Sequence, residues 1–335
     1  MRNAVTLVLV FVCQFAWAQG WEDQRSFNEA SATVTLRIIS STDTALFEPL
    51  IIAFVESNPD VAIEYLVTGT ADIDKRFREN PEAFDIAISS AMDLQLKLTN
   101  DGYALTVDDI NLPDWAQWRR SLFAFTSEPA TIVVNRQAFE GLPIPASRQE
   151  LIQALRSRPD IFQNRVGTYD VRRSGLGYLF ATQDARASET FWRLMEVMGS
   201  LDVQLYCCSG EMIDDLTDGT IAVAYNVLGS YANARTESKD TLEIIVPDDF
   251  STTMMRTAFI SRESRQPDAA QRFVRFLLTY QANRTDGLGT LPSLDEGGSA
   301  SDAAKIALEP ALMTFLDNLK RSKFLLEWEN ALIQN

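Results

Sequence analysis

The sequence predicts an α/β protein of two lobes, each built on a mostly parallel sheet with helices on its faces. Three observations predict this fold class. Short β-branched runs alternate with amphipathic helical patterns from residue 32 onward. A small polar loop follows each of the first three strands, as in doubly wound sheets. A second αβ block, residues 129–249, interrupts the first, so the chain would cross between the lobes twice.

The first lobe is expected over residues 33–128 and 250–335. Its early strands are predicted at 34–39, 61–67 and 84–88, and its early helices run to Ser57, over 71–79 and over 92–100. Further strands are predicted at 121–125 and 253–260, and an amphipathic helix at 268–280. Residues 285–300 are rich in Gly and Ser and predict a surface loop. One or two helices with Trp328 facing inward complete the tail.

The second lobe, residues 129–249, repeats the same alternation. Its strands are predicted at 131–135, 164–169, 203–206, 221–225 and 242–246. Its helices are predicted at 147–156, 175–184, 188–199 and from Ser209 onward. Because parallel sheets bind ligands at the carboxyl ends of their strands, the loops that follow these strands should line a site between the lobes.

Composition excludes several classes of function. The 335 residues contain 46 acidic and 30 basic side chains, a formal net charge of -16, and no histidine. An acidic chain without basic runs binds nucleic acid poorly, because contacts to phosphate dominate that affinity. The lack of histidine removes Ser-His-Asp and Cys-His catalysis and His-ligated metal sites. We expect no enzyme activity, no cofactor and no metal site.

The first eighteen residues are typical of a secretory signal peptide. Arg2 precedes the apolar run from Ala4 to Cys13, and Ala16-Trp17-Ala18 supplies a small-x-small cleavage site. The run is too short to span a bilayer, so we expect export to the periplasm rather than anchoring. Cys207 and Cys208 are adjacent, and their pattern favours two reduced thiols at the end of a buried strand over a strained bond between neighbours.

Four segments, in this order, carry a resemblance to a known family: Phe84–Ser90, Gly219–Asn226, Ala258–Ile260 and Pro267–Leu278. With the export signal, they resemble bacterial periplasmic solute-binding proteins of the two-crossover type. The similarity is nearest to the branch that binds iron(III) or phosphorylated sugars and includes regulators of phosphoglycerate transport. The resemblance implies the two-lobed periplasmic-binding-protein fold and ligand capture by hinge closure, for which these proteins are themselves a standard example.

The resemblance also implies partners. An inner-membrane ABC permease would receive the solute from a monomeric binding protein. The alternative is a membrane sensor kinase that reads the ligand state.

The residues favour a small organic anion, phosphorylated or carboxylated, as the ligand. Iron(III)-binding members of the family use adjacent tyrosines, whereas Tyr225 and Tyr231 here are six residues apart. A ferric-ion receptor therefore stays an alternative. Helix N-termini present free N–H groups, hydroxyl side chains add neutral donors, and arginine binds phosphate or carboxylate with two parallel hydrogen bonds.

The candidate ligand-binding residues are therefore Ser41, Thr42, Thr68, Thr70, Ser89, Ser90, Arg172, Arg173, Ser174, Gly175, Ser209, Tyr225 and Asn226. Each also has an ordinary structural interpretation. The hydroxyl residues are typical of helix caps and turns, and one of the two arginines is typical of a solvated surface charge. Tyr225 could be a core residue. Asp43 would repel an anion but accept hydrogen bonds from sugar hydroxyls.

Overall fold

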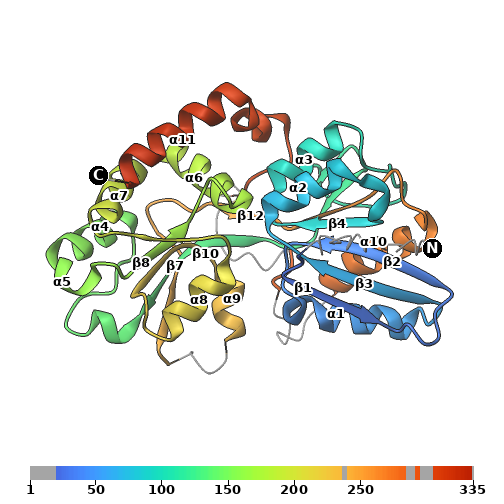
Figure 1. Ribbon diagram of the computed structural model, residues 1–335, viewed down its shortest axis with the longest axis horizontal. Coiled ribbons are helices and arrows are strands. Elements are labelled where there is room, and N and C mark those ends of the chain that lie inside the picture. The colour runs from blue at the N-terminus through green and yellow to red at the C-terminus, as the bar shows by residue number, and fades with distance from the viewer. Residues whose placement is uncertain (1–19, 236–239, 284–290, 295–304, 334–335) are drawn as a thin grey trace, which may run out of the picture.

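A computed structural model describes residues 20–235, 240–283, 291–294 and 305–333. The expected signal peptide and most of the expected loop at 285–300 lie outside these residues. Two αβ lobes lie side by side, and the chain passes between them along extended segments (Figure 1). The predicted fold class, two sheets flanked by helices, is confirmed. Within the described residues, no helix is both long enough and apolar enough to cross a bilayer.

The sheet of lobe 1 is mixed, although we expected it to be mostly parallel. Its order is β1-β3-β2-β4-β13-β6-β5. Parallel pairing joins β2 (Val34–Ser40) to β3 (Val61–Val67) and to β4 (Ile86–Ser89). The outer strands β1 (Asp23–Phe27), β13 (Thr257–Ile260), β6 (Leu122–Ala124) and β5 (Gln117–Trp118) pair antiparallel. Each of the three central parallel strands is followed by a helix: β2 by α1, β3 by α2 and β4 by α3.

Helices cover both faces of this sheet, as Figure 1 shows. α1 (Thr44–Ser57) and α10 (Pro267–Ala282) share one face, where Phe54 packs edge-on against Phe273 and Phe276. α2 (Thr70–Glu79) and α3 (Met92–Asn100) cover the other face. Short 3-10 turns at Pro81–Ala83 and Asp114–Ala116 complete the lobe.

Lobe 2 has a second sheet in the order β11-β7-β10-β8-β9. β8 (Val166–Tyr169) pairs parallel with β9 (Gln204–Tyr206) and β10 (Val223–Leu228), while β7 (Glu128–Asn135) runs antiparallel to β10 and β11 (Leu242–Ile245). The helices of this lobe are α4 (Arg148–Ser157), α5 (Pro159–Phe162), α6 (Gly175–Ala187), α7 (Thr190–Ser200), α8 (Ser209–Thr217) and α9 (Gly229–Ala234), with a 3-10 turn at Arg136–Phe139. The parallel strands of this sheet are again each followed by a helix: β8 by α6, β9 by α8 and β10 by α9.

The C-terminal helix differs from the expected division, which placed all of 250–335 in lobe 1. After a 3-10 segment, Pro310–Leu316, the helix α11 (Asn318–Leu332) packs along α7 of lobe 2. Phe324, Trp328 and Leu332 are buried in the core of that lobe. The apolar face of α11 packs against lobe 2, so we assign α11 to lobe 2. The chain therefore passes between the lobes a third time, in addition to its two strand crossings.

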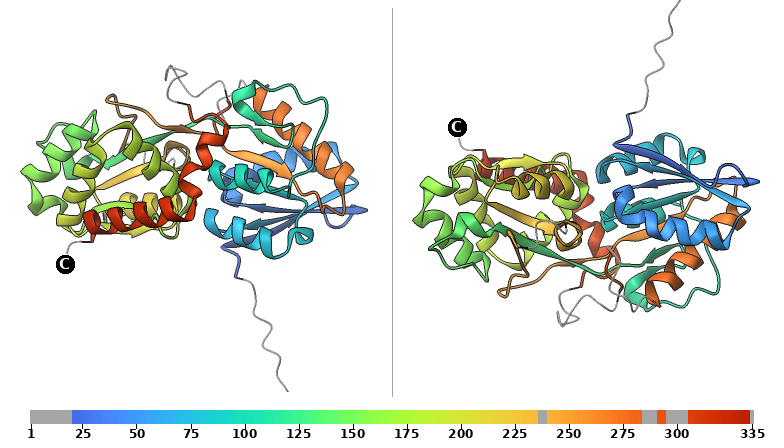
Figure 2. Two further views of the ribbon diagram at one scale, coloured as in Figure 1. Left: turned by 90° about the horizontal axis from the view of Figure 1, so that it is seen from above. Right: turned by 90° about the horizontal axis from the view of Figure 1, so that it is seen from below.

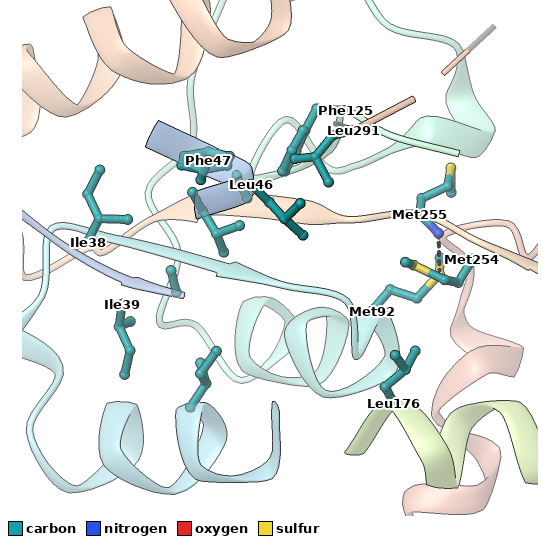
Figure 3. Packing of buried hydrophobic residues seen from close by; sticks show 14 of the residues in the cluster. Ile38, Ile39, Leu46, Phe47, Met92, Phe125, Leu176, Met254, Met255 and Leu291 are labelled. Atoms are coloured by element: carbon teal, nitrogen blue, oxygen red, sulfur yellow. Dashed lines mark hydrogen bonds between the residues drawn. The ribbon is translucent and has the colours of Figure 1, made fainter. Parts of the chain in front are cut away.

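The two strand crossings lie close together and are packed with apolar side chains. We expected one strand over 253–260, but it divides at Met255 and Arg256. β12 (Thr253–Met254) pairs with β7, and β13 pairs with β4 and β6. Figure 3 shows Met92, Met254, Met255 and Leu176 where α3, this crossing and α6 meet. The Met255 N–H points at the Met92 sulfur, 3.5 Å away. One hydrophobic cluster thus reaches from lobe 1 into lobe 2.

β1 has no counterpart in the sequence prediction. Its sequence, DQRSF, lacks apolar alternation, because it is an edge strand with its three central residues exposed. Its pairing with β3 rests on backbone hydrogen bonds, which composition does not show. The two views of Figure 2 place it at the outer edge of lobe 1.

Gly177→Ala is expected to destabilise lobe 2. A methyl group at this position would lie 2.2 Å from the Cβ atom of Tyr169, because α6 rests closely on β8. Overpacking of this kind lowers the free energy of unfolding by about 1–3 kcal/mol. Urea unfolding measures it, with Gly20→Ala as the control, since nothing lies within 4 Å of Gly20. Equal unfolding midpoints for the two variants would contradict the described packing of α6.

Candidate ligand-binding site between the lobes

The hydroxyl residues that follow β2 and β4 lie beside each other, because these strands are parallel neighbours. The Ser90 N–H donates to the Ser41 hydroxyl over 3.2 Å, and the two hydroxyl oxygens are 3.5 Å apart. Ser89 accepts a hydrogen bond from the Ala91 N–H. Thr42 and Ser90 are buried. The sequence prediction therefore groups Ser41, Thr42, Ser89 and Ser90 correctly in space, although their contact with a ligand stays a prediction.

The loop after β3 completes this side of lobe 1. The Thr68 N–H donates to the Ser40 carbonyl, which holds the loop next to the first one. Thr70 begins α2, and its hydroxyl accepts a 3.2 Å hydrogen bond from the N–H of Leu176 in lobe 2. We call the surfaces that meet here the inter-lobe face. Thr70 is a direct hydrogen-bond partner across it.

Lobe 2 contributes the beginnings of α6 and α8 to the inter-lobe face. Ser174 caps α6 by accepting from the Gly177 N–H, so its cap interpretation holds within lobe 2. A methyl group on Gly175 would lie 3.2 Å from both Thr70 Oγ1 and Ala91 Cβ of lobe 1. Ser209 begins α8, and its hydroxyl lies 2.5 Å from the Tyr169 hydroxyl. A side chain at position 175 would hold the lobes apart.

The arginine pair lies elsewhere. Arg172 makes two 2.8 Å hydrogen bonds to the carboxylate of Asp170, and its third nitrogen lies 3.4 Å from Glu329 of α11. Its guanidinium group also lies over the Trp328 ring, 5.7 Å from the ring centre. The Arg173 side chain is exposed, and its positive charge helps to hold the pKa of the Asp170 carboxyl below its usual range. Arg172 therefore anchors α11 rather than facing lobe 1.

Tyr225 and Asn226 also have partners away from the inter-lobe face. The Tyr225 hydroxyl accepts from Arg148 and donates to Asp184, each over 2.7 Å. Asn226 donates to the same carboxylate of Asp184 over 2.9 Å, from a left-handed backbone position at a β-bulge. These buried contacts hold β10 to α4 and α6 inside lobe 2, which is the core alternative foreseen for Tyr225. We leave Tyr225, Asn226, Arg172 and Arg173 out of the proposed site.

The structure adds two charged residues at the crossings that sequence reasoning missed. Arg256 is fully buried; it donates to Glu128 over 2.7 Å and to the Thr42 hydroxyl over 2.8 Å. Glu128 also accepts from Ser230 of α9. These bonds join the start of α1 in lobe 1 to α9 in lobe 2. No short motif signals them, since Glu128 and Arg256 are far apart in the sequence.

Acidic groups lie at one side of the inter-lobe face. Tyr231 donates a 3.2 Å hydrogen bond across it to Asp43. Burial raises the pKa of the Asp43 carboxyl, while the bond from Tyr231 opposes that rise. Burial also raises the pKa of Glu22, with further contributions from Asp43, Asp72 and Glu211. Carboxylates accept hydrogen bonds only, so this side favours hydroxyl or cationic groups over an anion.

Asp93 is a further buried carboxyl near the inter-lobe face. It lies in the first turn of α3, next to Leu94, whose side chain approaches Gly175. Its oxygen accepts from the Leu94 N–H, and Arg321 of α11 lies close enough to oppose the effect of burial. Burial raises the pKa of Asp93 to about 7.

Two αβ lobes that touch through hydroxyl-bearing helix N-termini, and that are joined by narrow crossings, have the architecture of the hinged two-domain binding proteins. The comparisons with known proteins give the particular family. The chain belongs to the bacterial extracellular solute-binding proteins, whose family model matches residues 82–317. The predicted family is thereby confirmed. Members of this family bind solutes, and the solved structures that share the fold include the substrate-binding protein of an ABC transporter.

Solved structures support the same assignment. The substrate-binding protein of an ABC transporter from Agrobacterium tumefaciens is 30% identical, with 92% of this chain and 98% of that chain covered and a TM-score of 0.84. AfuA from Actinobacillus pleuropneumoniae, with fructose-6-phosphate bound, is 15% identical over 91% and 100% of the chains, with a TM-score of 0.72. Iron-bound HitA from Pseudomonas aeruginosa is 14% identical over 89% and 99%, with a TM-score of 0.64. The last two show the fold alone. Among curated proteins there is no match.

Gly175→Ala is expected to oppose contact between the lobes while leaving each lobe folded. The added methyl group meets Thr70, Ala91 and Leu94 of lobe 1. At about 1–3 kcal/mol, this crowding disfavours the contact by about 5- to 150-fold relative to an arrangement in which the lobes are separated. Small-angle scattering should then give a larger radius of gyration than for the wild type. An unchanged radius, with unchanged circular dichroism, would contradict the described contact.

Asp93→Asn is expected to raise stability at pH 8 and not at pH 4. The folded-state pKa of Asp93, about 7, exceeds its ordinary value of 3.8. The carboxyl therefore contributes stability while it is protonated, and this contribution is lost as the pH rises from about 4 to about 7, by at most about 4 kcal/mol. Urea unfolding as a function of pH measures this, with the exposed Asp218→Asn as control. Parallel pH profiles for wild type and Asp93→Asn would contradict the assignment.

Proposed function

We propose that the protein captures a small hydroxylated organic anion, such as a phosphorylated sugar, between its lobes for uptake by an ABC permease. The observation that carries this proposal is the gathering of helix N-termini from both lobes at one face. α1, α2 and α3 begin there on lobe 1, and α6 and α8 begin there on lobe 2.

Helix N-termini favour the anionic part of such a solute. Their first N–H groups lack intrahelical partners and lie at the positive end of the helix dipole. Hydroxyls from Ser41, Thr42, Thr70, Ser90 and Ser209 add neutral donors at the same face. Thr68, Ser89, Ser174 and Gly175 are proposed to shape the loops around the solute. Backbone and hydroxyl donors of this kind can bind phosphate or carboxylate without a free arginine.

The acidic side of the face favours the rest of the solute. Asp43 and Glu22 can accept hydrogen bonds from sugar hydroxyls, whereas they would repel a second anionic group. A compound with one anionic end and one hydroxylated end satisfies both sides. The fold shared with a protein that holds fructose-6-phosphate is compatible with a solute of this size and chemistry.

The ferric-ion alternative receives less support from the contacts. Tyr225 is committed to Arg148 and Asp184, and Tyr231 donates to Asp43. The two phenol groups therefore bind different partners, and they do not form a pair of ligands for one ion. We further propose that the chain is exported by its N-terminal segment, acts as a monomer in the periplasm and delivers its solute to a permease.

Calorimetry should distinguish these ligand classes. We expect fructose 6-phosphate, or a related sugar phosphate or sugar acid, to bind, and free fructose to bind at least 10-fold more weakly. Ser90→Ala should weaken the binding about 2- to 13-fold, because it removes one hydroxyl donor, typically worth about 0.5–1.5 kcal/mol. Ser57→Ala, at the far end of α1, is the matched control. Binding of ferric ion but of no organic anion would overturn the proposal.

A further inference from the structure

A pair of thiols lies in the turn between β9 and α8. The strand ends at Tyr206 and the helix begins at Ser209, so Cys207 and Cys208 form the link. Both cysteines are free, and their sulfur atoms are 2.9 Å apart. Neighbouring side chains of an extended strand point to opposite faces, whereas this turn brings both thiols to one side.

A carboxylate completes the group. Glu211, in the first turn of α8, has Oε2 3.4 Å from the Cys207 sulfur. The two sulfur atoms and a Glu211 oxygen all lie within 4.8 Å of one another. Both cysteines are partly exposed and Glu211 is exposed, so a dissolved ion can reach all three.

The surroundings carry further negative charge. Glu22 of lobe 1 lies close enough to both Cys207 and Glu211 to interact electrostatically with each of them. A methyl group on Gly210 would lie 3.3 Å from Asp43 Oδ2, which places the turn at the acidic side of the inter-lobe face. Two thiols and several carboxylates, within a protein of net charge -16, attract cations rather than anions.

We propose that Cys207, Cys208 and Glu211 form a binding site for a thiophilic divalent cation such as Zn²⁺ or Cd²⁺. Zinc binds cysteine sulfur at about 2.3 Å, which in a tetrahedral site separates two sulfurs by about 3.8 Å. Small side-chain rotations in a partly exposed turn can supply that separation. The three ligands leave one coordination position for water or for an oxygen atom of a solute.

Binding of the ion balances as a proton exchange. Each thiol loses its proton as a metal–sulfur bond forms, so one ion displaces two protons, and a Glu211 carboxylate oxygen is the third ligand. No electron is transferred. The site rests on the thiol and carboxylate geometry and does not depend on the proposed organic ligand.

Titration of the fully reduced protein with Cd²⁺ under nitrogen tests the proposal. We expect one ion per chain, a thiolate-to-metal charge-transfer band in the ultraviolet and release of about two protons per ion. Loss of a group that only hydrogen-bonds to a metal ligand typically lowers metal affinity roughly 10- to 100-fold. Cys207→Ser and Cys208→Ser each remove a ligand itself, so each should weaken Zn²⁺ binding by more than this. Glu211→Gln should weaken it less, and Glu56→Gln, an exposed glutamate on α1, should not change it.

Circular dichroism of the metal-free variants verifies that they fold. Retention of the band in the double variant Cys207→Ser/Cys208→Ser would overturn the site. So would a stable bond between the two cysteines in the protein as it is exported, seen as a mass two hydrogens lower that persists under mild reduction. Failure of every sugar phosphate to bind would reject the proposed function and leave the metal site standing.

Discussion

The buried ion pair between Arg256 and Glu128 is the interaction on which the placement of the two lobes depends. Both side chains are removed from water, at 0% and 1% exposure. Such a pair is tolerated only when its remaining donors and acceptors are satisfied as well. Thr42 of lobe 1 accepts from Arg256, and Ser230 of lobe 2 donates to Glu128. The arrangement that satisfies the pair is therefore one in which both lobes are drawn against the crossings.

The same network links the fold to the site. Thr42 lies directly before Asp43, whose carboxylate receives the Tyr231 hydroxyl from the opposite lobe. The Arg256 guanidinium group also lies 5.7 Å from the centre of the Tyr231 ring. The buried charge of Arg256 is thus bonded to Thr42, which directly precedes Asp43 on the surface that we propose to contact solute. The electrostatic character of that surface, hydroxyl donors beside carboxylate acceptors, is set by loops whose positions the crossings fix.

Local patterns in the sequence predicted the parts of the molecule that local forces determine. The β-branched runs of β2 and β3 and the polar loops after them were predicted nearly residue by residue, since burial and capping act over a few positions. The neighbouring loops at Ser41 and Ser90 followed from the parallel order of the strands. Residues that act through distant partners could not be predicted in this way.

Arg172 illustrates the limit. Its position beside a helix N-terminus was correctly recognised, but Asp170, two residues earlier, and Glu329, at the other end of the chain, take its hydrogen bonds. Tyr225 is similar, because Arg148 and Asp184 come from two other helices. Arg256 was missed for the opposite reason: it lies in a segment that resembles an ordinary strand. In each case the side chain's role is decided by a partner that only the tertiary fold brings near.

The position of α11 has a consequence for how the molecule can be observed. The first described residues precede β1 on lobe 1, whereas the last helix lies on lobe 2 (Figure 1). Gly20 and Ile333, the first and last of the described residues, are therefore carried by different lobes, and any rotation of one lobe against the other changes the vector between these two ends. A donor and an acceptor fluorophore fused to these ends would convert that rotation into a change of energy transfer, without modification of any residue in between.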